Sequence, residues 1–352
     1  MNAGGGQVKV LRSLDDVASF QVSAERRLMS ATHEEIFSGA TSDVYFQKGY
    51  EVLRRLNLLE VPVVAEIFPQ RDGILCGVEE ALALLEGKVA AVWSLEEGQA
   101  FSAKEVVMRI EGRYGDFGIF ETAVLGILAA SSGWATAARA CREAVPNHPV
   151  SSFGARHVHP AVASVMDRAA RVGGVDGVSS ILGAKLVGLE PTGTIPHAVV
   201  LIAGDTLPVA EELAAISEER DLPCVVLIDT FKDEAEEALR VARALGPRLK
   251  GIRVDTPSER GGVTVDLVRE LRARLDQEGF HDVAIFCSGS LNPERLQQLA
   301  AAGASAFGVG HYISSAPPID MTMDLKEVDG KPRAKRGRIP GRTENPRLRR
   351  AL

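Results

Sequence analysis

Two glycine- and serine-rich runs follow predicted strands in the last quarter of the chain. Residues 287–292 (CSGSLN) include Ser288, Gly289 and Ser290, and residues 307–312 (FGVGHY) include Gly308 and Gly310. Glycine lets the backbone approach an anion closely, and amide groups at the start of a helix carry partial positive charge. The two runs therefore predict a phosphate-binding site, although tight turns in a strand–helix repeat are also compatible with them.

Charged side chains stand at the ends of other predicted strands. Arg253 and Asp255 are two residues apart, Asp229 ends the run VVLID, and Arg156 follows Phe153 closely. Residues at i and i+2 share one face of a strand, so Arg253 and Asp255 should point the same way. This set suits a sugar phosphate, with arginine for the charged oxygens and aspartate for ribose hydroxyls or a metal. An internal Arg–Asp ion pair is the open alternative.

A third candidate is the loop 192–198 (TGTIPHA), where Thr194 and His197 precede an apolar helix. A functional role for His197 and a purely structural one are both open. His157, His159 and His311 are weaker candidates. No HxxxH or HExxH spacing supports a metal cluster, so no protein-held metal site is predicted.

A fourth candidate lies near the N-terminus, in residues 41–50 (TSDVYFQKGY). Tyr45, beside Asp43, could supply an aromatic face to a flat ligand across a dimer interface. Ordinary packing at the edge of a sheet is the alternative.

Short apolar strands and amphipathic helices alternate after residue 145, which indicates a parallel sheet buried on both faces. The strand candidates are 150–155, 175–181, 185–191, 223–231, 250–256, 283–290 and 305–313. A helix at 292–303 should have Asn292 as its N-cap and Gly303 just past its end. Because the polar residues fall at the carboxyl ends of strands, a barrel with one mouth is favoured over an open sheet. The prediction is an α/β protein: an incomplete barrel of about seven strands plus an N-terminal α+β sandwich domain.

The predicted domains are an N-terminal α+β domain over 1–145, the barrel over 146–320 and a basic C-terminal segment over 321–352. Residues 331–352 hold nine Lys/Arg and one acidic residue, within a chain of net charge −7. We expect this segment to pack on the N-terminal domain or to be partly disordered. The acidic balance argues against general binding of nucleic acid.

The composition and the cysteines exclude further classes. The chain has 352 residues, 45% of them hydrophobic and 25% charged, which is typical of a globular protein. The four cysteines form no CxxC pair, so neither a disulfide framework nor a zinc site is expected. No apolar run reaches the roughly 18–20 residues of a membrane span, and no signal segment is evident. We therefore expect a cytoplasmic protein with no membrane partner.

Together these segments resemble the nicotinate phosphoribosyltransferase family, its shorter archaeal and bacterial members most closely. The family is related to the quinolinate phosphoribosyltransferases, whose incomplete barrel and N-terminal sandwich it shares. The residues that carry the resemblance are TSDVYF (41–46), FETAVLGIL (120–128), FGARHVHP (153–160), LEPTGTIPHA (189–198), IDTF (228–231), GIRVDT (251–256), CSGSL (287–291), FGVG (307–310) and EVDGKPRAKRG (327–337).

The resemblance implies transfer of phosphoribosyl from phosphoribosyl pyrophosphate to nicotinate, within NAD biosynthesis, giving nicotinate mononucleotide and pyrophosphate. It assigns Phe153, with Tyr45 of a second subunit, to the pyridine ring, and Arg156 and Arg253 to carboxylate and phosphates. The catalytic candidates are His197, Arg253, Asp255 and Asp229. The other substrate-binding candidates are Asp43, Ser179, Lys185 and Thr194. The phosphate-binding candidates are Ser288, Gly289, Ser290, Gly308 and Gly310.

The resemblance also implies Mg²⁺ bound with the pyrophosphate, a homodimer or higher oligomer with shared sites, and ATP as co-substrate. His197 matches the histidine that is phosphorylated in ATP-coupled members, yet it could serve the sugar site without phosphorylation. Ser179 stands where nicotinamide-using relatives carry aspartate, which favours nicotinate. The alternatives are a quinolinate or nicotinamide phosphoribosyltransferase, or a barrel that binds a sugar phosphate without turnover.

Overall fold

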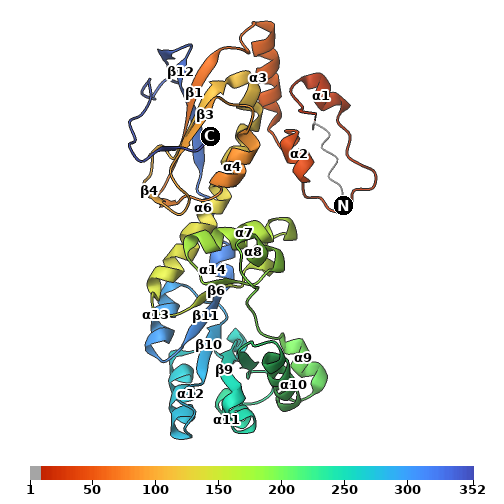
Figure 1. Cartoon of the computed structure of the whole chain (residues 1–352), viewed down its shortest axis with the longest axis vertical. Coiled ribbons are helices and arrows are strands. Elements are labelled where there is room, and N and C mark those ends of the chain that lie inside the picture. Colours follow the sequence, from red (N-terminus) through yellow and green to blue (C-terminus); the bar gives the residue numbers. More distant parts are fainter. Residues whose placement is uncertain (1–8) are drawn as a thin grey trace. The chain divides into compact units, whose positions relative to one another are not determined.

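The computed structural model describes residues 9–352 and divides into two compact units (Figure 1). The N-terminal unit comprises the residues up to Thr136 together with Pro317–Leu352, and the parallel-sheet unit comprises Ala137–Ala316. Helix α6 (Glu121–Ala144) begins in the first unit and ends in the second.

The N-terminal unit is built on a six-stranded antiparallel sheet in the order β13-β12-β1-β5-β3-β14. Its strands are β1 (Pro62–Pro69), β3 (Ala91–Ser94), β5 (Met108–Arg113), β12 (Met321–Val328), β13 (Lys331–Pro332) and β14 (Arg349–Arg350). A second, two-stranded sheet pairs β2 (Gly73–Ile74) with β4 (Ala100–Phe101). Three strands of the large sheet thus come from the last 32 residues, and β12 pairs with β1 along nearly its whole length.

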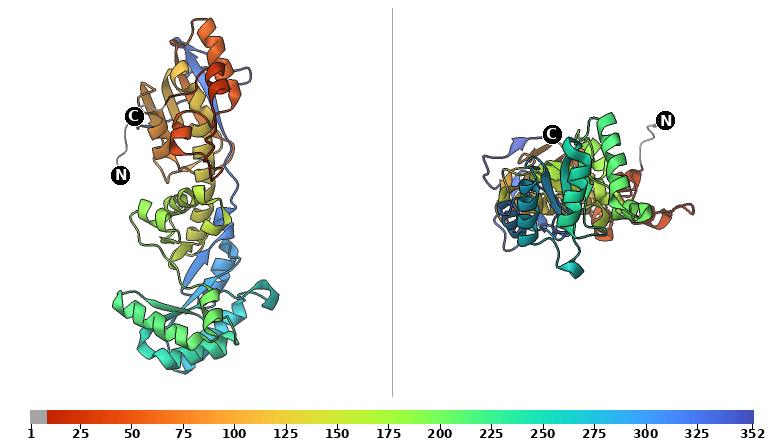
Figure 2. Two further views of the ribbon diagram at one scale, coloured as in Figure 1. Left: turned by 90° about the vertical axis from the view of Figure 1, so that its right-hand side faces the viewer. Right: turned by 90° about the horizontal axis from the view of Figure 1, so that it is seen from below.

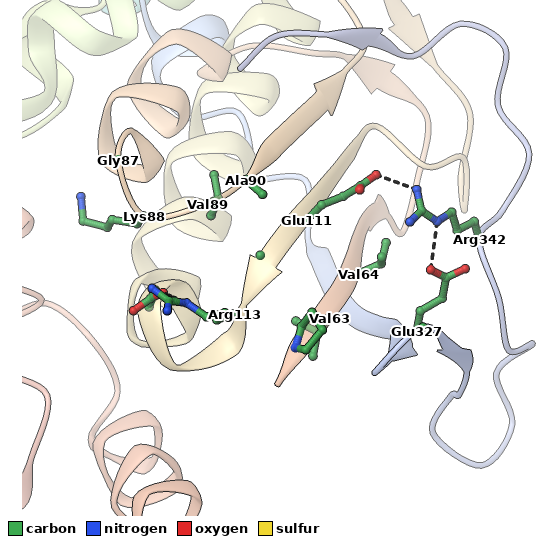
Figure 3. A pocket seen from close by; sticks show the side chains of 14 residues that line it. Val63, Val64, Gly87, Lys88, Val89, Ala90, Glu111, Arg113, Glu327 and Arg342 are labelled. Atoms are coloured by element: carbon green, nitrogen blue, oxygen red, sulfur yellow. Dashed lines mark hydrogen bonds and ion pairs between the residues drawn. The ribbon is translucent and has the colours of Figure 1, made fainter. Parts of the chain in front are cut away.

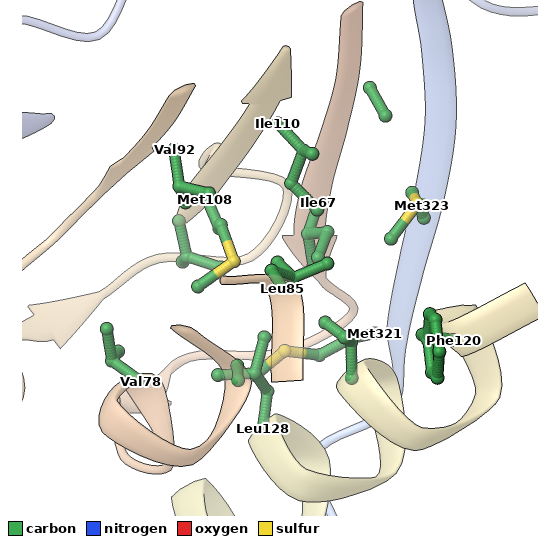
Figure 4. Close-up of a cluster of buried hydrophobic side chains, with 14 of the residues drawn as sticks. Ile67, Val78, Leu85, Val92, Met108, Ile110, Phe120, Leu128, Met321 and Met323 are labelled. Atoms are coloured by element: carbon green, nitrogen blue, oxygen red, sulfur yellow. The ribbon is translucent and has the colours of Figure 1, made fainter. Parts of the chain in front are cut away.

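The core of this unit lies between the large sheet and its helices. Ile67, Met108 and Ile110 on the sheet are fully buried and lie near Leu128 of α6, with Met321 of β12 in the same cluster (Figure 4). The helices are α1 (Leu14–Ser19), α2 (His33–Phe37), α3 (Val44–Arg55), α4 (Val78–Leu85), α5 (Tyr114–Phe117), the 3₁₀ turn Gly118–Phe120 and α6.

The basic C-terminal segment follows the N-terminal sheet. Arg338 pairs with Asp324 of β12, and Asn345 donates to the side chain of Glu105 and the carbonyl of Val106. Arg338, Arg342 and Arg347 therefore meet acidic partners within their own unit.

The second unit holds six parallel strands in the order β7-β6-β11-β10-β9-β8. The strands are β6 (Val150–Ser152), β7 (Gly177–Val178), β8 (Cys224–Leu227), β9 (Leu249–Val254), β10 (Ala284–Ser288) and β11 (Ala306–Val309). Because β11 pairs with β6, the strands follow one another around a curled sheet that stays open between β7 and β8. The predicted α/β class, with its incomplete barrel and its N-terminal sheet domain, is confirmed.

Helices connect the parallel strands and pack against them (Figures 1 and 2). They are α7 (Pro160–Gly173), α8 (Ile181–Leu186), α9 (His197–Ala203), α10 (Thr206–Glu219), α11 (Glu234–Leu245), α12 (Val265–Gln277), α13 (Pro293–Ala301) and α14 (His311–Ser314). The predicted ends of α13 are confirmed: the side chain of Asn292 accepts the Arg295 amide at 2.9 Å, and Gly303 has a φ of +109°.

The predicted strand 185–191 is wrong, and the sheet has six strands rather than about seven. Ser180 caps α8 by accepting the amide of Gly183, so residues 181–186 form a helix. A parallel strand here would be buried on both faces, whereas Leu186 is 57% exposed and the Glu190 side chain 82%. Residues 187–196 form the loop that joins α8 to α9.

Among the described residues, one helical stretch, Tyr114–Ala144, is long and apolar enough by length and composition to cross a membrane. Half of its most apolar window is buried inside the protein, and core helices of soluble proteins meet the same criterion.

Candidate active site

Arg253 at the end of β9 joins three separate segments of the parallel-sheet unit. Its Nε donates to Ser288 Oγ of β10 (2.9 Å), one terminal nitrogen to Thr194 Oγ1 (2.8 Å), and the other to Asp255 Oδ2 (2.9 Å). Because β9 and β10 are adjacent and parallel, their carboxyl ends meet at one edge. The prediction that Arg253 and Asp255 share a face is confirmed, and they form the ion pair that the sequence left open.

Asp255 is held on its other side by Ser288, whose hydroxyl donates to Oδ1 at 2.9 Å. The backbone then turns through Gly289 (φ +92°) and Ser290 (φ +51°), both left-handed. A Cβ on Gly289 would lie 3.1 Å from Asp255 Oδ1, so a larger residue would press on the carboxylate. This turn leaves Gly289 and Ser290 exposed next to the Arg253–Asp255 pair.

His197, the first residue of α9, lies between two carboxylates. Its Nε2 is 3.7 Å from Asp229 Oδ2 and 3.9 Å from Asp255 Oδ2, and its Nδ1 is 3.2 Å from Thr230 Oγ1. An imidazole so placed could hold or move a proton beside either acid.

Asp229, just beyond β8, is the charged residue of this site whose carboxylate is least compensated by neighbouring groups. Its side chain is fully buried, and neither oxygen has a hydrogen-bond partner among residues 9–352. Burial raises the pKa of Asp229, and the neighbouring His197 opposes that rise. Burying a carboxylate without hydrogen-bond donors costs free energy, and a bound cation would offset that cost.

Phe153 follows β6 and lies against the glycine run of β11. The Arg253 guanidinium carbon is 5.4 Å from the centre of the Phe153 ring, and Phe286 lies 5.8 Å away. A Cβ on Gly308 would come within 2.5 Å of the ring, so only glycine fits beneath it. A Cβ on Gly310 would lie 2.9 Å from the ring of His157. The Nδ1 of His157 is 3.1 Å from Ser314 Oγ.

The structure brings some predicted residues together and leaves others apart. Arg156 is exposed in the 3₁₀ turn Ala155–His157 and makes no hydrogen bond or ion pair with residues 9–352. Ser179 is half-buried between β7 and α8. Lys185 is paired with Glu190 instead of with the mouth residues.

The segment 41–50 belongs to the N-terminal unit. Asp43 precedes α3 and accepts the hydroxyl of Thr122 at 3.0 Å, while Tyr45 is 60% exposed. Burial of its hydroxyl, then Asp43 and Glu121, raise the pKa of Tyr45. The ring therefore stays neutral and offers an accessible face.

Two residues next to the candidate site were not predicted from the sequence, Thr230 beside His197 and Glu234 at the start of α11. Thr230 stands directly after the strand-end Asp229, and that position was its only signal. Glu234 looks like one of several acidic residues at the start of α11, which the helix dipole explains equally well.

A cavity of about 590 Å³ in the N-terminal unit is a poor anion site (Figure 3). Arg342, in its wall, donates to Glu111 at 2.6 Å and Glu327 at 3.0 Å, and Arg113 is paired with Glu60 and Asp116. Both arginines are already neutralised, and Lys88, which also lines the cavity, donates to the Leu84 carbonyl at 2.7 Å. The strand ends of the other unit are therefore the better candidate.

Comparison with known proteins finds one family along most of the chain. The sequence profile of the quinolinate phosphoribosyl transferase N-terminal domain matches residues 43–132, and that of its C-terminal domain matches residues 134–324.

Three relatives illustrate the range of similarity. The solved structure of nicotinate-nucleotide pyrophosphorylase from Pyrococcus furiosus is 43% identical, covers 90% of this chain and 82% of its own, and superposes with a TM-score of 0.86. Nicotinate phosphoribosyltransferase of Bacillus subtilis is 29% identical over 68% of this chain and 50% of its own. A Methanothermobacter thermautotrophicus relative named "Probable nicotinate-nucleotide pyrophosphorylase (carboxylating)" is 23% identical over 75% of this chain and 88% of its own. The chain thus spans about half the length of the curated nicotinate enzyme.

Proposed function

This chain belongs to the quinolinate phosphoribosyltransferase family, and from that membership we propose that it is a nicotinate phosphoribosyltransferase. It would join nicotinate to phosphoribosyl pyrophosphate, forming nicotinate mononucleotide and pyrophosphate. The observation that carries the proposal is the convergence of Arg253, Asp255 and His197 at adjacent strand ends. This arrangement offers charges of both signs to a sugar phosphate.

The acceptor would bind beside Phe153. A pyridine ring would stack on its side chain, and Tyr45 of a second copy of the chain would cover the other face. Arg156, exposed and unpaired within residues 9–352, would hold the carboxylate. Such sharing makes a homodimer the smallest active form. The turn at Gly289–Ser290, Gly308 of β11 and Gly310 just after it would hold the 5′-phosphate through backbone amides.

Catalysis would rest on positioning and charge. Breaking the bond between the anomeric carbon and pyrophosphate leaves positive charge on the sugar and negative charge on the departing group. Asp229 and Asp255 lie where they could face the ribose, while Arg253 could face the phosphates. Holding the nicotinate nitrogen in line with the anomeric carbon would supply the rest of the rate acceleration.

The acidic pair fits a magnesium ion, because Asp229 presents two buried oxygens without donors and Asp255 lies on the same side of His197. Carboxylates are suitable ligands for Mg²⁺, which would arrive with the pyrophosphate and neutralise its charge. Asp229 and Asp255 would hold it.

We further propose that ATP hydrolysis is coupled to the reaction through His197. With Nδ1 near Thr230, its Nε2 faces the two carboxylates and is the nitrogen that a phosphoryl group would occupy. The same placement also suits a histidine that only orders the acids.

The charge count at the mouth favours an acceptor with one carboxylate. Arg253 is engaged by Asp255, and Lys185 is neutralised by Glu190, which leaves Arg156 as the unpaired cation of these three. Quinolinate, with two carboxylates, needs at least one cation more. Quinolinate remains the second candidate, because the matching profiles are named for quinolinate phosphoribosyl transferase. The Pyrococcus furiosus and Methanothermobacter relatives are named as nicotinate-nucleotide pyrophosphorylases.

The test is formation of mononucleotide from phosphoribosyl pyrophosphate and Mg²⁺, with nicotinate, nicotinamide or quinolinate in separate reactions, each with and without ATP. We expect product from nicotinate, with ATP raising the rate. Product from quinolinate with release of carbon dioxide would replace the proposal by the second candidate. Binding of phosphoribosyl pyrophosphate without product from any acceptor would indicate a binding protein.

A further inference from the structure

One buried carboxylate joins the two loops that carry the acids of the mouth. Glu234 is the first residue of α11 and is only 3% exposed. It lies five residues after Asp229, directly after the loop that follows β8. Its two partners, Thr256 and Arg260, belong to the loop that follows β9, on which Asp255 lies.

The contacts of Glu234 are direct and use both carboxylate oxygens. Thr256, itself 5% exposed, donates its hydroxyl to Oε1 at 2.8 Å. Arg260 donates through Nε to Oε1 at 3.2 Å and through a terminal nitrogen to Oε2 at 3.0 Å. Burial by itself would raise the pKa of Glu234, but the bonds from Arg260, its own amide and Thr256 outweigh it and hold that pKa below its usual range.

Thr256 is the chain neighbour of Asp255, and the two side chains serve different partners. Asp255 binds Arg253 and Ser288 at the mouth, while Thr256 reaches Glu234. Fixing Thr256 therefore fixes the backbone from which Asp255 projects.

Side chains of two arginines tie the rest of the loop to neighbouring helices. The backbone hydrogen bonds of the loop are short-range: Gly262 and Arg260 donate their amides to Pro257, and Gly261 to Ser258. Arg295 of α13 donates to the Val263 carbonyl at the far end of the loop. The tie to α11 runs through Arg260, which binds Glu234 and, at 3.2 Å, the N-cap Asp233.

We propose that Glu234 is a positioning residue that, through Thr256 and Arg260, holds Asp255 in its place beside Asp229 and the Nε2 of His197. The inference rests on the proposed phosphoribosyl transfer. It predicts that loosening the contact harms the chemical step more than it harms folding or substrate binding, because Asp255 acts on charge that develops in the transition state.

Thr256 offers a matched pair of variants. Thr256→Val keeps the shape and removes the hydroxyl, while Thr256→Ser keeps the hydroxyl and removes a methyl group. For Thr256→Val we expect kcat for mononucleotide formation to fall about 10- to 100-fold, the cost of a displacement near 1 Å, with KM for phosphoribosyl pyrophosphate little changed. Thr256→Ser should behave like the wild type. Glu236→Gln, an exposed change on the same helix, is the control for altered charge.

Hydrogen–deuterium exchange of the peptide over 255–264 gives a readout that does not depend on turnover. Exchange should quicken in Thr256→Val and in Glu234→Gln, and stay at the wild-type rate in Thr256→Ser and Glu236→Gln. Unchanged exchange in Thr256→Val would overturn the inference, and so would faster exchange with wild-type kcat. A fall in kcat shared equally by Thr256→Ser would also overturn it.

If the wild-type protein forms no product from any acceptor, the proposed function fails by itself. The inference is then decided by exchange of the peptide over 255–264. Faster exchange in Thr256→Val with wild-type exchange in Thr256→Ser would support the positioning role, and unchanged exchange in Thr256→Val would refute it.

Discussion

Replacing Arg253 by alanine tests whether its hydrogen bonds to Ser288, Thr194 and Asp255 both stabilise the fold and contribute to catalysis. The Arg253 side chain is 15% exposed and makes three hydrogen bonds, one of them to a carboxylate. Truncation removes these bonds and leaves Asp255, 24% exposed, with Ser288 as its remaining donor. From charge-assisted bonds and a partly buried ion pair we expect the free energy of unfolding to fall by about 2–4 kcal/mol.

The expected loss can be measured by thermal unfolding. In a unit of this size each kcal/mol lowers the melting temperature by about 2–4 °C, so Arg253→Ala should melt roughly 5–15 °C below the wild type. Arg269→Ala, which removes an exposed arginine from α12, should melt close to the wild type.

Turnover should fall by at least about 10²–10³-fold at a temperature where Arg253→Ala remains folded, the typical cost of losing one preorganised charge. Arg253→Lys keeps the charge and loses the planar fork, so it should recover stability better than rate. If Arg253→Ala has a lowered melting temperature but wild-type kcat, Arg253 stabilises the fold and does not contribute to catalysis. Wild-type stability together with wild-type kcat would refute the whole assignment.

Three further predictions follow from other groups. His197→Ala should abolish the stimulation by ATP while sparing a slow basal reaction, measured as ADP and mononucleotide formed in parallel; equal loss of both would contradict a phosphorylated histidine. Ser179→Asp should raise kcat/KM for nicotinamide relative to nicotinate, because a carboxylate repels one acceptor and accepts from the amide of the other. Burial, followed by the charge of Asp324, raises the pKa of Glu121 to about 7 from an ordinary 4.5, so wild-type stability should fall as pH rises from about 4.5 to 7. Glu121→Gln should remove that fall and be more stable by about 1–3 kcal/mol at pH 8 but not at pH 4, measured by denaturant titration.

Sequence patterns predicted the parallel-sheet unit well because its signals are local. Most of its strands are short apolar runs, and most of its helices have a side-chain N-cap, as Asn292 is for α13. The strand predicted at 185–191 failed because Ser180 caps a helix there, a signal weaker than the apolar residues around it. The pairing of β12 with β1 had no local signal at all, since it joins residues more than 250 positions apart.

The sequence indicated which residues are candidates for the site, but not the hydrogen bonds and ion pairs that they form. Spacing by two placed Arg253 and Asp255 on one face, and their ion pair follows from it. Which partner each charge takes depends on how adjacent loops are packed. Thus Lys185 looked available from the sequence and is paired with Glu190, whereas Glu234 looked like an ordinary helix-start acid and bridges two loops.

The buried acidic residues of the parallel-sheet unit differ in whether the protein supplies hydrogen-bond donors to their carboxylates. Asp167 accepts the hydroxyl of Ser152 and the amide of Ser180, and Glu237 binds the guanidinium of Arg240 with both oxygens; all these bonds are 2.7–3.0 Å long. Asp229 is as fully buried and has no such donor among residues 9–352. A fold that satisfies its other buried carboxylates so completely gains no stability from leaving this one bare. The cost is understandable where a cation from outside the chain must enter and leave, since internal donors at Asp229 would compete with it.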